Sequence, residues 1–244
     1  MNTIKVEAKG TKFVAHRGVS GIERENTAPA FVAAGNRGYF GIECDVHVTA
    51  DRKFVVIHDE TTKRVTNGRI DINVEKCVSE DIANIVLPDL DGTTARRDIR
   101  IPTLAEYVKI CKKYEKRCVI ELKNPFIRDD IESFIEEIKA LDYLDSITFI
   151  AFSLENCVHL RDLLPDAHIQ FLAWGPVDDN MISILEKYKF DIDIGQKTLT
   201  KEGIDRVHAI GQKVNCWTVD DKARAEELIA MGVDYITTNI LEGV

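Results

Sequence analysis

The sequence contains no C-x-x-C pair, no apolar run long enough to cross a membrane and no excess of basic residues. The missing cysteine pairs argue against a zinc site or a disulfide framework, and several cysteines lie in apolar, strand-like runs. We expect all six to be reduced and buried: Cys44, Cys77, Cys111, Cys118, Cys157 and Cys216. The first nine residues lack the apolar centre of a secretory signal, so we expect a cytoplasmic protein without stable membrane association.

Basic residues are outnumbered by acidic ones, 32 to 41, which gives a formal net charge of −9 at pH 7. Nucleic acids and anionic membranes require a basic face, so neither is expected as a partner. A chain of this charge that handles a phosphate group needs a metal ion or a local basic pocket.

Two catalytic or cofactor motifs are also missing. No G-x-S-x-G occurs, which weakens any hypothesis of a serine nucleophile. No G-x-G-x-x-G follows the first strand-like run, which disfavours the alternative of an open, doubly wound sheet.

The chain does contain a regular alternation of strand-like runs and amphipathic segments. Nine runs have the composition of strands: 12–15, 39–49, 54–59, 118–122, 147–152, 169–174, 190–194, 213–219 and 234–238. Helices are expected at 26–35, 103–114, 129–141, 154–164, 179–188, 201–209 and 222–231. Repeated strand–helix units predict an α/β fold, a (β/α)8 TIM barrel formed as a single domain by residues 1–244.

A barrel has eight strand positions, so one of the nine runs must lie outside it. Only residues 50–53 separate the second run from the third, and this link is too short for a helical crossover. These two runs should form an antiparallel hairpin, with one of them outside the ring; the weak run 190–194 is the other candidate. Residues 60–100 are polar and rich in turn signals, which predicts an insertion subdomain or lid on the catalytic face, after the third strand.

Three carboxylates are candidates for a metal site. Period-two alternation places Glu43 and Asp45 on one face of their strand, where they repel each other unless a cation lies between them. Hard ions such as Mg²⁺ or Ca²⁺ bind carboxylate oxygens, and the apolar neighbours of this pair favour metal ligation over an exposed surface pair. Glu121 is a third candidate ligand, with Lys123 beside it, although a surface ion pair explains the same E-x-K pattern.

Two histidines, His16 and His58, each end an apolar strand-like run. One such histidine is more often structural, but two near a carboxylate pair suit a general base and a general acid. Arg17 could bind a phosphate through its guanidinium group. Trp217 either fills the core or lines a ligand pocket, and His47 is expected beside the site or exposed rather than catalytic.

Taken together, these residues resemble the glycerophosphodiester phosphodiesterase family. The shared motifs run through almost the whole chain in the expected order. They are His16-Arg-Gly18, Glu25-Asn-Thr27, Ile42-Glu-Cys-Asp-Val46, Thr49-Ala-Asp51, Val56-Ile-His-Asp59, Arg64-Val-Thr66, Ile101-Pro-Thr-Leu104, Ile120-Glu-Leu-Lys123, Trp217-Thr-Val219 and Gly232-Val-Asp-Tyr-Ile-Thr237.

The resemblance implies a phospholipase-C-like TIM barrel that hydrolyses glycerophosphodiesters, such as glycerophosphocholine or glycerophosphoethanolamine, to sn-glycerol 3-phosphate and an alcohol. It implies Mg²⁺ or Ca²⁺ as cofactor, with Mn²⁺ as a further candidate. Carried over by position, the metal ligands are Glu43, Asp45 and Glu121. The acid–base pair is His16 and His58, the phosphate contacts are Arg17 and Lys123, and Trp217 is a wall for the glycerol moiety.

The chain departs from the family pattern at two places. Arg24 stands where a proline commonly precedes Glu-Asn-Thr, and Asn239 follows Thr238 where the family has aspartate. Neither change falls on a proposed metal or histidine position. Two other functions stay open, namely a lysophospholipase D-like phosphodiesterase and a non-catalytic binding protein on the same barrel. A monomer or a homodimer is expected.

Overall fold

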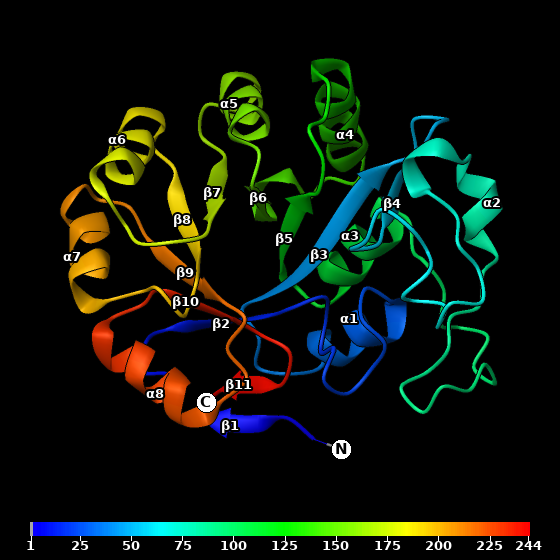
Figure 1. Ribbon diagram of the computed structural model, residues 1–244, viewed down its shortest axis with the longest axis horizontal. Helices are drawn as coiled ribbons and strands as arrows, with labels where there is room; N and C mark the ends of the chain where they lie inside the picture. The colour runs from blue at the N-terminus through cyan, green and yellow to red at the C-terminus, as the bar shows by residue number, and fades with distance from the viewer. Residues whose placement is uncertain (1) are drawn as a thin grey trace.

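The computed structural model describes residues 2–244 and contains a closed ring of eight parallel strands with helices around it (Figure 1). In the sheet the strands follow the order β2-β10-β9-β8-β7-β6-β5-β3, and pairing of β2 with β3 closes the ring. The strands are β2 (Lys12–Ala15), β3 (Gly41–Val48), β5 (Arg117–Leu122), β6 (Ile147–Ala151), β7 (His168–Ala173), β8 (Asp191–Gly195), β9 (Val214–Trp217) and β10 (Tyr235–Thr238). The predicted TIM barrel is confirmed.

Helices follow the strands and cover the outside of the ring. They are α1 (Ala28–Gly35), α3 (Leu104–Lys113), α4 (Arg128–Ala140), α5 (Leu154–Leu163), α6 (Asp179–Tyr188), α7 (Lys201–Ala209) and α8 (Lys222–Met231), with a 3₁₀ turn η2 (Leu144–Ser146) before β6. Side chains at several helix starts accept a hydrogen bond from the first turn, which satisfies an otherwise unpaired N–H group. Thr103 and Glu106 do so reciprocally at α3.

The ninth strand candidate proves to be β4 (Phe54–Val56), which pairs antiparallel with β3 outside the parallel ring. The predicted hairpin is therefore confirmed, and the suspicion about the run 190–194 was wrong. That run is β8, which pairs with β7 and β9. It looks weak in sequence because Asp193 interrupts its isoleucines, yet this side chain points into the barrel while Ile192 and Ile194 pack outside.

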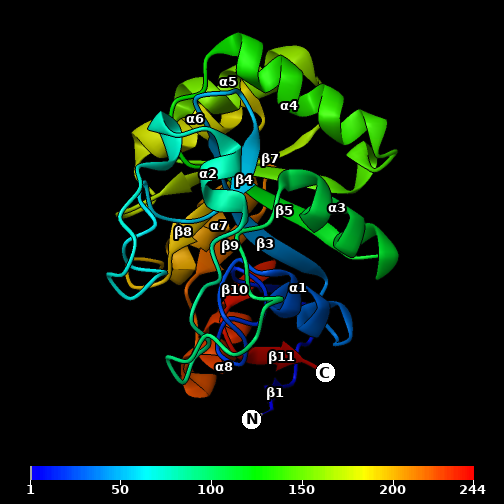
Figure 2. The same cartoon turned by 90° about the vertical axis from the view of Figure 1, so that its right-hand side faces the viewer.

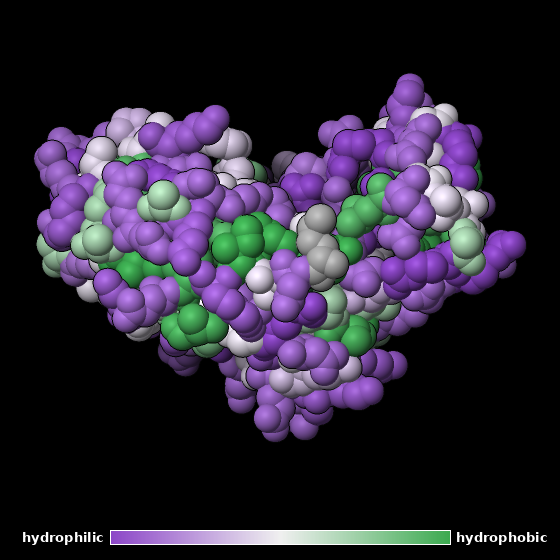
Figure 3. Space-filling model, turned by 90° about the horizontal axis from the view of Figure 1, so that it is seen from below, coloured by the Kyte–Doolittle hydropathy of each residue, from purple (hydrophilic) through white to green (hydrophobic). Residues whose placement is uncertain are grey.

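A second, two-stranded parallel sheet of β1 (Ile4–Val6) and β11 (Leu241–Gly243) lies beside the barrel and joins the two ends of the chain. Each strand has three residues, too few for a period to be recognised in the sequence. Figure 3 shows the molecule from this side, where most of the surface is hydrophilic and apolar groups form separate patches. No helix within residues 2–244 is both long enough and apolar enough to span a membrane.

Residues 60–100 lie to one side of the ring and contain the 3₁₀ turn η1 (Val74–Lys76) and the helix α2 (Ser79–Ala83) (Figures 1 and 2). This segment has an apolar core that is separate from the core of the barrel. Three residues next to the segment, in β4 and after it or before α3, also contribute to this separate core. Its buried members are Val55, Ile57, Val65, Val74, Cys77, Ile82, Ile85, Leu87, Ile99 and Ile101. All six cysteines of the chain are unpaired and buried, as expected.

Candidate active site

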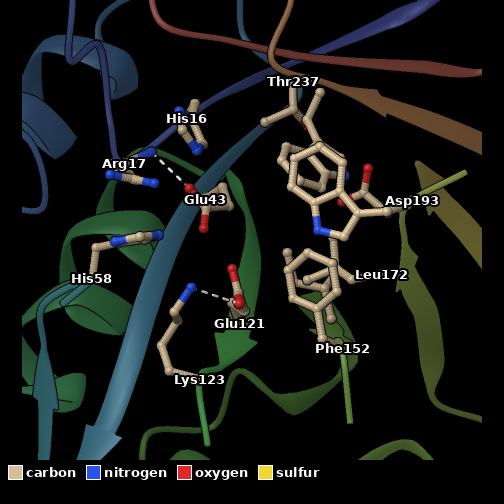
Figure 4. A pocket seen from close by; sticks show the side chains of 13 residues that line it. His16, Arg17, Glu43, His58, Glu121, Lys123, Phe152, Leu172, Asp193 and Thr237 are labelled. Carbon is tan, nitrogen blue, oxygen red and sulfur yellow. Dashed lines mark hydrogen bonds and ion pairs between the residues drawn. The ribbon is translucent and has the colours of Figure 1, made fainter. Parts of the chain in front are cut away.

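A cavity of about 140 Å³ opens at the carboxyl ends of the barrel strands (Figure 4). Every barrel strand, or the residues just after it, contributes to its lining. The lining residues are His16, Arg17, Glu43, His58, Glu121, Lys123, Ile150, Phe152, Leu172, Trp174, Asp193, Trp217 and Thr237. Most of the polar residues expected in the site therefore share one cavity, and no residue of the segment 60–100 is among those that line it.

Three carboxylates, those of Glu43, Asp45 and Glu121, offer oxygen atoms within 4.8 Å of one another. They come from the neighbouring strands β3 and β5, where Asp45 lies directly opposite Glu121 in register. All three side chains are buried, with at most 8% of the residue surface exposed. Within residues 2–244, Oδ1 of Asp45 accepts no hydrogen bond, although it lies 3.4 Å from Nζ of Lys123.

The pKa values of the three carboxyl groups are shifted in different directions. Burial, together with the charge of Asp45, raises the pKa of Glu43 well above its ordinary value and raises that of Glu121 to about 7. Burial acts in the same direction on Asp45, but the charges of Arg17 and Lys123 outweigh it and lower the pKa of that carboxyl group. A group of acids that resists full ionisation and has an unpaired oxygen suits a divalent cation.

Arg17 is held against two of these carboxylates by an unusual backbone. Its φ of 55° lies in the left-handed region, and its N–H donates to Oε2 of Glu43 at 2.7 Å. Its Nε lies 3.2 Å from Oδ2 of Asp45, and Nη1 donates to Glu25 at 2.9 Å. Gly18 permits this turn because a Cβ atom there would lie 2.6 Å from the backbone of Ala30.

His16 is oriented by a residue near the other end of the chain. Its Nδ1 lies 2.8 Å from Oδ1 of Asn239, which also accepts from the hydroxyl of Ser20. The amide nitrogen of Asn239 donates to Asp220 at 2.6 Å, so its oxygen must face the histidine. His16 therefore carries its proton on Nδ1 and leaves Nε2 free as an acceptor. Burial lowers the pKa of His16 to about 4.

His58 has a charged partner instead. Its Nδ1 lies 2.7 Å from Oδ1 of Asp59, and Arg64 donates to both oxygens of that carboxylate. Arg64 also binds Glu25, which in turn contacts Arg17. Burial lowers the pKa of His58, while the charge of Asp45 and the hydrogen bond with Asp59 oppose this change.

His47 is buried, with 1% of its surface exposed, rather than exposed to solvent. Its Nε2 lies 3.1 Å from the carbonyl oxygen of His58, and its Nδ1 lies 3.0 Å from Glu75. It does not line the cavity but supports the backbone of a residue that does.

Aromatic side chains form the opposite side of the cavity. The rings of Trp174 and Trp217 meet edge to face at 4.4 Å, and Phe152 stacks on Trp174 at 6.2 Å. Gly195 leaves room for this arrangement, because a Cβ atom there would lie 3.0 Å from the ring of Trp174. Trp217 therefore lines the pocket rather than filling the core.

Sequence reasoning assigned no role to several residues of this site. Asn239 was noted only as a departure from the family pattern, and Asp59 and Arg64 only as members of motifs. Phe152, Trp174, Asp193 and Thr237 carried no signal that separates a cavity residue from a core or loop residue.

Almost the whole chain matches one known protein family. The family model described as the glycerophosphoryl diester phosphodiesterase family matches residues 16–242. The chain belongs to this family. The resemblance expected from the motifs is therefore confirmed, and with it the class of the protein, a phosphoric diester hydrolase.

Similar bacterial proteins align with almost the whole chain. YhdW of Bacillus subtilis is 31% identical to it over 93% of both chains. The glycerophosphodiester phosphodiesterase of Bacillus altitudinis is 29% identical over 94% of both chains. The crystal structure of a glycerophosphodiester phosphodiesterase from Parabacteroides distasonis has a TM-score of 0.78, with 28% identity over 94% of this chain and 93% of that one.

A phosphodiesterase from Oleispira antarctica, solved in complex with the product sn-glycerol-3-phosphate, has the same barrel. Its TM-score is 0.85, with 24% identity over 93% of this chain and 92% of that one.

Proposed function

We propose that the protein hydrolyses glycerophosphodiesters, such as glycerophosphocholine or glycerophosphoethanolamine, to sn-glycerol 3-phosphate and an alcohol. One observation carries the proposal: two histidines with different partners line a single cavity together with an arginine, a lysine and a cluster of three buried carboxylates. A phosphodiester needs charge stabilisation on its phosphate and proton transfer at two oxygens, and this arrangement offers both.

Glu43, Asp45 and Glu121 would hold the divalent cation. Three observations support this role. The carboxylates lie close together, the pKa values of Glu43 and Glu121 are raised, and Oδ1 of Asp45 has no hydrogen-bond donor within residues 2–244. A bound Mg²⁺, Ca²⁺ or Mn²⁺ ion supplies a Lewis acid that neutralises charge on phosphate oxygens and lowers the pKa of a coordinated hydroxyl group.

The two histidines would divide acid and base catalysis. We assign the base to His16, because its partner is a neutral amide and its Nε2 has a free electron pair. We assign the acid to His58, because the carboxylate of Asp59 stabilises the protonated imidazole. His16 would remove the proton from the attacking hydroxyl group, and His58 would protonate the departing alcohol oxygen. If water attacks, sn-glycerol 3-phosphate forms directly; if a hydroxyl group of the glycerol moiety attacks, a cyclic phosphate forms, and a water molecule then opens its ring to give the same product.

Arg17 and Lys123 would bind the non-bridging phosphate oxygens. Both are already paired with carboxylates, Arg17 with Asp45 and Lys123 with Glu121 at 2.8 Å. The segment 60–100 would act as a support as well as a cover, since Arg64 from this segment anchors Asp59 behind His58 and Glu25 behind Arg17. Through these contacts a segment that does not line the cavity would hold two catalytic side chains in place.

A lysophospholipase D-like reaction is the second candidate. The human protein named lysophospholipase D GDPD1 is 41% identical to the chain over 106 residues, which is 39% of this chain and 32% of that protein. The exposed aromatic rings of Phe152 and Trp174 would have to accept an acyl chain in that case. A non-catalytic role is disfavoured because both histidines and all three carboxylates are present.

Incubation with glycerophosphocholine and Mg²⁺, Ca²⁺ or Mn²⁺, followed by an enzymatic assay for sn-glycerol 3-phosphate, tests the proposal. Product is expected with at least one ion and not with EDTA. His16→Ala and His58→Ala should each lower kcat by about 10²- to 10⁴-fold while the melting temperature stays nearly unchanged. No product with any of the three ions would refute the proposed function, and near-normal turnover of either variant would remove that histidine from the mechanism.

A further inference from the structure

Asn26 carries a buried amide group beside the carboxylate cluster, and no function described above uses it. The residue ends the loop after β2, two residues before α1, with 4% of its surface exposed. It is not among the residues that line the cavity, so it lies behind the site rather than in it. Because nearly all buried polar groups in proteins are paired, the partners of this side chain indicate its task.

Both polar atoms of the side chain face one residue, the candidate cation ligand Asp45. Nδ2 of Asn26 donates to Oδ2 of Asp45 at 2.7 Å, and the backbone nitrogen of Asp45 lies 3.4 Å from Oδ1 of Asn26. Burial opposes ionisation of Asp45, but the charges of Arg17 and Lys123 outweigh it and lower the pKa of this carboxyl group. An ionised carboxylate only accepts, which settles the orientation of the amide. Asn26 therefore fixes the carboxylate of Asp45 relative to its own backbone.

This contact makes the two oxygens of Asp45 different. Oδ2 accepts from Asn26 and lies 3.2 Å from Nε of Arg17. Oδ1 is buried and accepts no hydrogen bond within residues 2–244, and its nearest cationic group is Nζ of Lys123 at 3.4 Å. A hard cation needs a carboxylate oxygen that no donor occupies. Oδ1 is therefore the oxygen that is left for an ion.

Arg17 alone would hold Asp45 less firmly than Asn26 does. Its contact with Oδ2 is longer, 3.2 Å against 2.7 Å, and its guanidinium group is also bonded to Glu25. In the proposed function a phosphate group binds the same guanidinium. The amide of Asn26 bonds only to Asp45 within residues 2–244, so this contact is independent of the substrate.

The backbone at this position also suits an asparagine. Asn26 has a φ of 53°, in the left-handed region that asparagine adopts more readily than most residues. Its N–H donates to the carbonyl oxygen of Arg17 at 2.9 Å, which closes the loop between the two residues. A glycine would adopt this conformation equally well but would leave Oδ2 of Asp45 without the amide. The backbone and the side chain of Asn26 can therefore be tested separately.

We propose that Asn26 is a positioning residue for the divalent cation, because it bonds to Oδ2 of Asp45 and leaves Oδ1 directed to the ion. This inference rests on the proposed function, in which Glu43, Asp45 and Glu121 hold the ion. Residues that orient a metal ligand without touching the metal typically change metal affinity by about 10- to 100-fold when they are replaced.

The decisive variant is Asn26→Gly, which keeps the left-handed backbone and removes the amide. Isothermal titration of the EDTA-treated and dialysed protein with Mg²⁺, Ca²⁺ or Mn²⁺, without substrate, measures the affinity directly. The variant should raise the Kd of the ion that the wild type binds by about 10- to 100-fold. The ion concentration that gives half-maximal turnover of glycerophosphocholine should rise by the same factor. An unchanged Kd would overturn the inference.

Asn67→Gly is the matched control. Asn67 has a nearly identical φ of 54°, but it is exposed and lies in the segment 60–100, away from the carboxylates. The Kd of this variant should equal that of the wild type. If it binds the ion as weakly as Asn26→Gly, the loss comes from the backbone change and the inference is overturned.

Asn26→Asp tests the inference if Asn26→Gly folds poorly. It keeps the size of the side chain, replaces the donor with an acceptor and adds a fourth negative charge near the ion. If charge alone determined affinity, this variant would bind the cation more tightly than the wild type. Because Oδ2 of Asp45 loses its donor and meets a like charge, we expect weaker binding. An unchanged or lower Kd would contradict the proposed role of Asn26.

The two proposals fail in different ways. If the wild type binds none of the three ions and releases no sn-glycerol 3-phosphate from glycerophosphocholine, the proposed function is refuted. If the wild type binds an ion and is active, and the Asn26 variants bind that ion with the same Kd, only the assignment of Asn26 is refuted.

Discussion

The two sides of the cavity are built from different parts of the chain and from different kinds of side chain. The charged side comes from β2, β3, β4, β5 and the loops after them, all within the first 123 residues, and its ionised groups are paired with one another. The aromatic side comes from β6 to β9 and contains Phe152, Trp174 and Trp217, with the unpaired oxygen of Asp193 beside them.

The difference between the two sides suggests that one carries out the chemistry and the other recognises the substrate. On the charged side, repulsion among carboxylates and the burial of histidines shift pKa values, which is typical of groups that take part in chemistry. On the aromatic side, flat apolar surfaces are suited to recognising the shape of a substrate. Substitutions on the charged side should therefore affect kcat, and those on the aromatic side should affect KM.

Apart from the two histidine variants, Glu121→Gln should have the largest effect on the charged side. Losing one of three cation ligands should lower kcat by about 10³-fold, since a metal ion contributes several kcal/mol to charge stabilisation. The melting temperature in EDTA should not fall, because the variant removes one of three mutually repelling groups.

The control is Glu242→Gln. Glu242 is also buried, but it lies on β11 and is paired with Lys5 and Thr3. This variant should lower the melting temperature and leave kcat unchanged. If Glu121→Gln keeps its activity with Mg²⁺, Ca²⁺ or Mn²⁺, the carboxylate cluster is not the cation site.

Acid should destabilise the charged side through Glu25. Burial acts to raise the pKa of Glu25, but hydrogen bonds from Arg64 and the charge of Arg17 outweigh it and lower the pKa from 4.5 to about 2. A carboxyl group with a depressed folded pKa stabilises the protein above its unfolded pKa. This stabilisation, on the order of 2 kcal/mol, is lost as pH falls from about 4.5 towards 2.

Thermal melting between pH 7 and pH 3 measures this loss. Arg64→Met should be less stable at pH 7 and should show a flatter decline with acid, because the pKa of Glu25 returns towards its ordinary value. An equally steep decline in the variant would show that the ion pairs around Arg64 do not cause the acid sensitivity.

Trp174→Ala should have the smallest effect. Trp174 is 70% exposed and contributes one face to the aromatic wall. Its loss should raise KM for glycerophosphocholine by about 2- to 10-fold, as expected for one aromatic contact, and leave kcat and the melting temperature nearly unchanged. A fall in kcat with unchanged KM would mean that the aromatic side takes part in chemistry, and the division between the two sides would no longer hold.

The charged side could be predicted from the sequence better than the aromatic side. Glu43 and Asp45 stand two residues apart on an apolar strand, and His58 ends the next apolar run, so their grouping follows from the short distance along the chain. Trp174 and Asp193 have no such neighbours. Asp193 weakened the prediction of its own strand. In the sequence, a polar residue that points into a barrel cannot be told from one that interrupts an apolar strand.

The sequence by itself determined the barrel, through the number and order of its strand–helix units, and determined which residues alternate between the two faces of each strand. It also placed the carboxylates and histidines of the charged side within one stretch of the chain. Only the tertiary structure decided that Asn239 meets His16 across 223 residues and that Asp193 and Trp217 line one cavity. The reason is geometric, because a period of two fixes the face of a strand, whereas the register between strands and the closure of the ring determine which side chains meet.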